Sequence, residues 1–157
     1  MSLCIPEATF EVSETTWTCA ISNLPDFDSC PSSPNCISSL DIEDESHYVP
    51  PIQISSQFSN SQIDKKIQEA LDGVKQHFPA VNFWNKPTVE IIRDNKNKYT
   101  VIFRTYYLEF PDIWKIQKVD RQIVFKFQSK YGYYDLGVNK KNSEIFRKEM
   151  LEALKKA

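Results

Sequence analysis

The sequence predicts an α+β fold: a helix, a roughly four-stranded antiparallel sheet and a C-terminal helix, preceded by an irregular acidic region with one or two short strands. Two observations carry this prediction. The period of the apolar residues changes along the second half of the chain from helical to strand-like and back. The charge also changes sign, because residues 1–63 hold nine acids and no Lys or Arg, whereas residues 64–157 hold all 19 basic side chains and 12 acids. We therefore divide the chain into an acidic Ser/Pro-rich region, 1–58, and a basic α+β domain, 59–157.

The acidic region is expected to be partly irregular. Alternating apolar side chains predict two short strands or a hairpin in residues 8–21. Pro, Asp and Ser recur every few residues between Leu24 and Pro34, which favours turns and extended backbone. Residues 22–58 are therefore predicted to be irregular chain.

The basic domain begins with a predicted amphipathic helix. Apolar side chains recur there at helical spacing and stop before Pro79, so the helix is expected to span residues 62–78. Ser61, with Asp64 three residues later, is a variant of the capping box and is expected to start the helix. His77 lies near its end, where the helix dipole stabilises a cation.

The apolar period then becomes that of strands. Polar residues 94–97 and the pair Asp120-Arg121 are predicted to form two hairpin turns, and Pro111 is expected to break the run between them. Gly132 and Gly137 bracket a last short extended piece. The predicted strands are Thr88–Arg93, Lys98–Phe110, Trp114–Val119 and Gln122–Gln128.

The chain closes with a second predicted helix. Apolar residues from Ile145 to Leu154 mark this helix, and Asn142 or Ser143 is expected to cap it. Each helix has one apolar stripe to bury, and an antiparallel sheet with both helices on one face accommodates both stripes. The order of elements is similar to that of the double-stranded RNA-binding domain. The second helix lacks the Lys-Lys start of that family, so no residue is carried over from it.

Catalytic and metal-binding motifs are absent from the sequence. The four cysteines form no C-x2-C pair and follow no secretory signal, so free thiols are expected in place of a zinc site or disulfides. The acidic stretch Asp41–Glu45 contains no Gly, unlike an EF-hand loop, and is expected to be solvated together with His47. With three Gly in the chain, phosphate-cradling loops are not expected. We predict no catalytic residue, no cofactor and no metal.

The composition also bears on location. No run approaches 18 apolar residues, so no helix is expected to span a membrane. The first ten residues carry no Lys or Arg, which is not typical of a secretory signal. An intracellular location, cytoplasmic or nuclear, is expected.

Basic and aromatic side chains alternate along the predicted strands. The run Arg104–Phe110 (RTYYLEF) is apolar or aromatic on both faces, so one face is expected to expose rings as a binding surface. The function that follows is a non-catalytic protein–protein interaction domain of adaptor or scaffold type. The acidic N-terminal arm is expected either to cover this surface or to bind a partner itself. The predicted partner-binding residues are Arg104, Tyr106, Trp114, Lys126 and Tyr133.

Two alternatives remain open from the sequence. Basic side chains beside exposed rings are what single-stranded nucleic acid needs, since charge binds phosphates and rings stack on bases. In that case the acidic arm would act as an electrostatic mask over the basic face. The third class is an enzyme with no recognisable motif.

Overall fold

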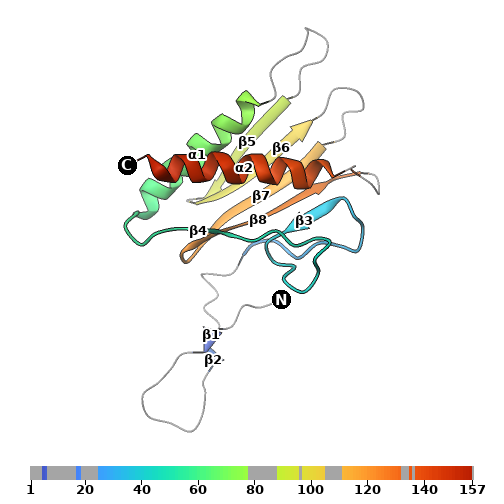
Figure 1. Cartoon of the computed structure of the whole chain (residues 1–157), viewed down its shortest axis with the longest axis horizontal. Helices are drawn as coiled ribbons and strands as arrows, with labels where there is room; N and C mark the ends of the chain where they lie inside the picture. Colours follow the sequence, from blue (N-terminus) through green and yellow to red (C-terminus); the bar gives the residue numbers. More distant parts are fainter. Residues whose placement is uncertain are drawn as a thin grey trace.

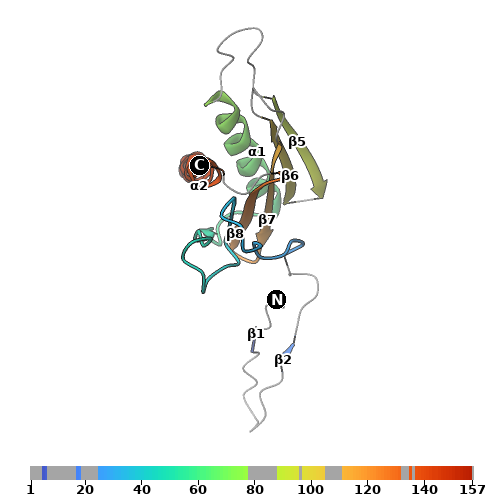
Figure 2. The ribbon, with the colours of Figure 1, turned by 90° about the vertical axis from the view of Figure 1, so that its right-hand side faces the viewer.

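The computed structural model describes residues 5–6, 17–18, 25–77, 88–95, 97–104, 111–131, 135 and 137–156. Within these residues, two helices cover one face of a six-stranded antiparallel sheet (Figures 1 and 2). The predicted α+β class is confirmed. The division of the chain between residues 58 and 59 stays a prediction.

The sheet has the order β3-β8-β7-β6-β5, and β4 also pairs with β8. The helices are α1 (Asn60–Gln76) and α2 (Val138–Lys155). The strands of the sheet are β3 (Cys36–Ser38), β4 (Ile52–Gln53), β5 (Thr88–Asn95), β6 (Lys98–Arg104), β7 (Pro111–Val119) and β8 (Gln122–Ser129).

Two hairpins form the centre of the sheet, as predicted. Asn97 and Asp120 take positive φ angles of 60° and 52° at the two turns, a conformation that Asn and Asp tolerate better than most residues. Pro111 was expected to break the run of strand residues. In the structure it begins β7. This is a position where its missing N–H costs the ladder little.

The described part of the acidic region is more ordered than the sequence predicted. Residues 36–38 and 52–53 form β3 and β4, which pair end to end with the same edge of β8. Strands of two or three residues carry no measurable period, so the pattern that revealed the long strands could not reveal them. A separate pair joins β1 (Ile5–Pro6) to β2 (Trp17–Thr18). β2 lies within the predicted range 8–21, whereas β1 precedes it. The rest of that prediction lies outside the described residues.

Both helices begin earlier than the sequence indicated. Ser59, not Ser61, is the N-cap of α1, and its capping box is completed by Gln62. The N-cap of α2 is Gly137, with φ 76°. Asn142 and Ser143, expected as caps, are buried inside α2. At the other end of α1, His77 is the C-cap, which agrees with its predicted position near the helix end.

The core lies between the helices and the sheet. Register places Val101, Trp114 and Phe127 side by side across three strands, all pointing toward the helices. The Trp114 ring stacks on Phe127 at a centroid distance of 4.3 Å. Phe146 of α2 meets Phe125 edge-on at 5.6 Å, which joins the second helix to the same aromatic layer.

A buried carboxylate fastens α1 to the β5–β6 hairpin. The Tyr99 hydroxyl donates to Asp64 Oδ1 at 2.5 Å, and the Asn97 backbone N–H donates to the same oxygen at 3.1 Å. Arg93 Nη2 lies 2.6 Å from Asp64 Oδ2. Asp64 was expected to be a capping residue, but its carboxylate makes tertiary contacts to the β5–β6 hairpin. These contacts pair its charge and satisfy its oxygens, which is what a buried carboxylate requires.

Candidate functional site

The face of the sheet that points away from the helices is called the outer face here. Strand alternation assigns its side chains, because residues two apart share a face. Basic and apolar side chains share this face, whereas the sequence predicted basic side chains together with exposed aromatic rings. In the three central strands the outer-face residues include Lys98, Thr100, Ile102, Arg104, Ile113, Lys115, Gln117, Val124, Lys126 and Gln128.

The predicted partner-binding residues do not all lie on this face. Arg104 and Lys126 do, and Arg104 Nη1 lies 3.5 Å from Glu90 Oε2. Trp114 does not: its side chain is 0% exposed and points toward the helices. Tyr106 and Tyr133 lie outside the described residues.

The error in placing Trp114 has a simple origin. Trp114 is paired with Val101, whereas Arg104 is paired with Pro111. Residues 111 and 114 are an odd number of positions apart, so they point to opposite faces of one strand. Trp114 therefore cannot share a face with Arg104. Its ring, which was expected to be exposed for binding, stacks on Phe127 in the core.

A short acidic segment crosses the outer face. We call residues 25–30 the strap. Asp26 forms an ion pair with Lys98, and its backbone N–H donates to Gln117 Oε1 at 2.9 Å. The hydrogen bond from Lys98 lowers the pKa of Asp26 below its usual value, and the positive charge of Lys98 adds to this effect. At the other end of the strap, Lys126 Nζ donates to the Ser29 carbonyl at 3.4 Å.

A hollow of about 290 Å³ lies between the strap and strands β7 and β8. Phe27 forms its strap side, and Ile113 adds an apolar wall from β7. The remaining lining residues are Lys115, Lys126, Gln128 and Lys130. Of these six residues, Lys126 is the one that the sequence predicted as a site residue.

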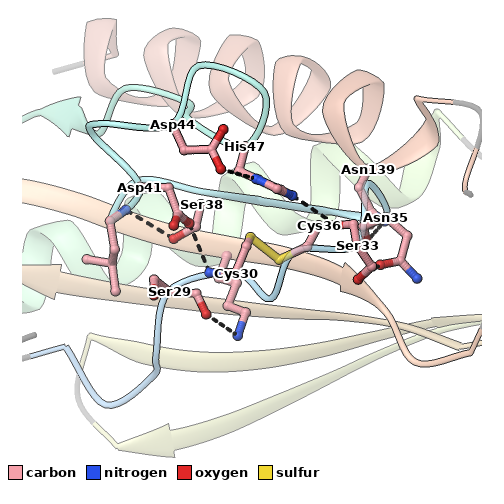
Figure 3. Close-up of a disulfide and its surroundings, with 12 residues drawn as sticks. Ser29, Cys30, Ser33, Asn35, Cys36, Ser38, Asp41, Asp44, His47 and Asn139 are labelled. Atoms are coloured by element: carbon pink, nitrogen blue, oxygen red, sulfur yellow. Dashed lines mark hydrogen bonds and ion pairs between the residues drawn. A yellow bond between two sulfur atoms is a disulfide. The ribbon is translucent and has the colours of Figure 1, made fainter. Parts of the chain in front are cut away.

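The strap ends at a disulfide bond between Cys30 and Cys36 (Figure 3). This corrects the expectation of free thiols for these two residues; Cys4 and Cys19 lie outside the described residues. Cysteine spacing alone does not report whether two Cα atoms approach, and here β3 and the strap bring them to 5.7 Å. The Cys30 backbone N–H also donates to Asp41 Oδ2 at 2.9 Å, so the strap is held where it reaches β3.

His47 stabilises the loop around this disulfide (Figure 3). Its Nδ1 lies 2.7 Å from Asp44 Oδ2, and its Nε2 lies 2.9 Å from the Ser33 carbonyl oxygen. Burial acts to lower the pKa of His47, but the bonds to Asp44 and Ser33 outweigh it and raise the pKa above its usual value. The prediction that His47 is solvated is wrong, since the residue is 6% exposed. Both ring nitrogens are engaged, so His47 has a structural role.

Among the described residues, no three His, Cys, Asp or Glu side chains are placed to hold a metal ion. None of the described helices combines the length and the apolar character needed to cross a membrane. The arrangement on the outer face is suited to binding acidic groups through Lys and Arg.

Comparison with known proteins gives one result that bears on identity. Neither the curated proteins nor the solved structures contain a match to this chain. A family model described as a protein of unknown function, DUF1499, matches residues 26–150, from the strap through the sheet and into α2. The match covers most of the sequence, and the chain belongs to the DUF1499 family.

Proposed function

We propose that this chain is a non-catalytic protein-interaction domain whose outer face binds an acidic segment of a partner protein. The strap is the observation that carries the proposal. It is an acidic segment with one aromatic residue, and it already lies on that face through Asp26, Phe27 and the Ser29 carbonyl. The chain thus supplies an internal example of the ligand that the face accepts.

The strap is held by contacts that a competitor can replace. The Asp26 side chain is 66% exposed, and exposed ion pairs contribute little to stability. A partner segment with more acidic residues would gain contacts to Lys126 and Arg104, which stay in the proposed site. Tyr106 and Tyr133 remain part of the proposed site as predictions from the sequence. Trp114 is no longer part of it, because its side chain is buried.

Nucleic acid is the alternative ligand. The same basic face supports this alternative, because its Lys and Arg could contact phosphates. Stacking of the bases, however, requires exposed aromatic rings. The described rings of strands β6 to β8 are buried on the helix side. Two described rings remain near the hollow: Phe27, which lines it, and the exposed Tyr131, whose ring centroid lies 5.4 Å from Lys130 Nζ. We therefore favour a protein partner, and the experiment below includes an oligonucleotide to separate the two.

The test measures, by anisotropy, the binding of a fluorescent peptide of residues 23–29, which contains the strap up to Ser29. In Asp26→Lys the Asp26 end of the strap is repelled by Lys98, while its Cys30 end stays held by the disulfide. The part of the face around Lys98 is then free, and the peptide should bind at least fivefold more tightly than to the parent chain. The matched control is Asp72→Lys, which makes the same charge change at an exposed position on α1. A peptide with both Asp replaced by Asn should bind weakly.

Two outcomes would contradict the proposal. Equal gains in Asp26→Lys and Asp72→Lys would mean that only net charge matters, and no docking site would remain. Tighter binding of a labelled single-stranded oligonucleotide than of any acidic peptide, with a steep salt dependence, would instead favour the nucleic-acid alternative.

The compartment is also a matter for proposal. An intracellular location was expected, but disulfides persist mainly in oxidising compartments and are rare in the cytosol. We infer that the domain works where the Cys30–Cys36 bond stays oxidised. Thiol labelling of protein taken rapidly from its own cells, followed by peptide mapping of Cys30, measures this. A fully labelled Cys30 would mean that the bond is reduced in the cell, and it would favour a location in the cytosol or nucleus.

A further inference from the structure

The basic residues of the outer face fall into two groups. Lys98 is paired with Asp26, and Arg104 is paired with Glu90. Lys115, Lys126 and Lys130 are in none of the ion pairs found among the described residues. The basic side chains of the face that lie outside these ion pairs are therefore concentrated at strands β7 and β8, around the hollow beneath Phe27.

The position of two of these lysines is unfavourable for the sheet alone. Lys115 and Lys126 are directly opposite each other in the β7–β8 register, and like charges at that position destabilise a strand pair. Their ammonium groups donate only to neutral oxygens, Thr100 Oγ1 at 2.8 Å and the Ser29 carbonyl at 3.4 Å. Asp26 acts on Lys115, and Asp28 and Asp41 act on Lys126, through their negative charges. None of these carboxylates forms an ion pair with either lysine among the described residues, so a function in binding is the better explanation for the opposed lysines.

The lining of the hollow suits a negative ligand. Its six lining residues include three lysines and no carboxylate. Asp28 and Asp41 act on Lys126 only from beyond ion-pair distance, and burial lowers the pKa of Lys126. A ligand charge at this place would compensate the partly desolvated ammonium group. The volume, about 290 Å³, lies at the lower limit of small-molecule sites, so the ligand must be compact.

We propose that the hollow lined by Lys115, Lys126 and Lys130 binds a compact oxyanion with at least two negative charges, carried by phosphate groups or by several carboxylates. Phe27 and Ile113 provide apolar walls against which the body of such a ligand packs. The site requires no protein partner and no displacement of the strap. It therefore goes beyond the proposed interaction domain and can be right or wrong independently of it.

The experiment is isothermal titration of the full-length chain, at low ionic strength, with pyrophosphate in one arm and citrate in the other. One-to-one saturable binding of at least one of them is expected, and the arm that binds identifies the phosphate or the carboxylate source. Lys126→Met keeps most of the length of the side chain and removes its charge, so it should weaken binding at least tenfold. Lys65→Met, on an exposed position of α1, should leave binding unchanged.

Acetate, with one charge, serves as the ligand control and should bind at least tenfold more weakly. Lys115→Met is the second variant and should reproduce the loss seen with Lys126→Met. If one of the two variants misfolds, the other still tests the proposal. Absence of saturable binding in both arms would overturn the proposal. So would an equal loss in Lys65→Met, because binding would then follow the total charge of the chain and not the hollow.

Discussion

Asp112 lies where burial and charge are in conflict, and changing it to Asn should stabilise the protein at neutral pH. The residue is 5% exposed, and register places it between Phe103 and Ser129 on the helix side of the sheet. Burial raises its pKa from 3.8 to about 6, although a hydrogen bond from Ser129 acts in the opposite direction. Asp135 adds a smaller raising effect through its negative charge.

The direction of the pH effect follows from proton binding. Between about pH 4 and pH 6 the folded protein holds a proton on Asp112 that the unfolded chain releases, so stability falls as the pH rises through this window. The pKa change is about two units, and each unit corresponds to about 1.4 kcal/mol, so the penalty above pH 6 is about 3 kcal/mol at most. Asp112→Asn resembles the protonated form and removes this penalty.

The assay is urea denaturation followed by tryptophan fluorescence, at about pH 4 and about pH 8. Asp112→Asn should match the parent at the lower pH and exceed it by up to about 3 kcal/mol at the higher pH. Asp72→Asn, at an exposed position of α1, is the control and should show no such divergence. A variant that is less stable than the parent at both values would refute the reasoning, since the carboxylate would then be making favourable contacts.

Three further substitutions test other parts of the fold. Tyr99→Phe removes the hydroxyl that donates to Asp64 and should cost about 1–3 kcal/mol in the free energy of unfolding, because a buried carboxylate loses a donor; an unchanged denaturation midpoint would contradict this. Cys30→Ser opens a short disulfide loop and should cost about 2 kcal/mol, a difference that vanishes when parent and variant are compared under reducing conditions. Gly73→Ala improves helix propensity by about 1 kcal/mol, but the added Cβ would overlap the Glu149 carboxylate; thermal melts should show the full gain only when Glu149 is also changed to Ala.

The main elements of the fold could be predicted from the sequence, because long elements leave a period. The helix after residue 60, the two hairpins and the terminal helix were recognised in this way. The positions of β3 and β4 could not be, since they are only three and two residues long and depend on pairing with a distant edge. Tertiary contacts also decided the caps: Asp64, which reads locally as a capping residue, is used to bind Tyr99.

The candidate site was predicted less well, for a physical reason. Residue type indicated a basic face and an acidic segment able to cover it, and the strap agrees with that expectation. Which residues share the face depends on strand register, and register is a property of the folded sheet. Trp114 was misplaced for this reason, and Lys115 was missed although it lies directly opposite Lys126. The disulfide was missed because sequence spacing does not encode Cα distance.

The pairing of β3 and β4 with β8 has a consequence for biosynthesis. Ser39 bonds to Phe125, a residue 86 positions later in the chain. During synthesis the strands near the N-terminus leave the ribosome long before their partner strand exists, because translation proceeds at roughly 5–20 residues per second. The β7–β8 hairpin can form locally, whereas closing its outer edge requires a long loop to be ordered. Until that happens, β8 has an exposed edge that another chain could pair with, so the pairing of β3 and β4 with β8 also protects the nascent protein from aggregation.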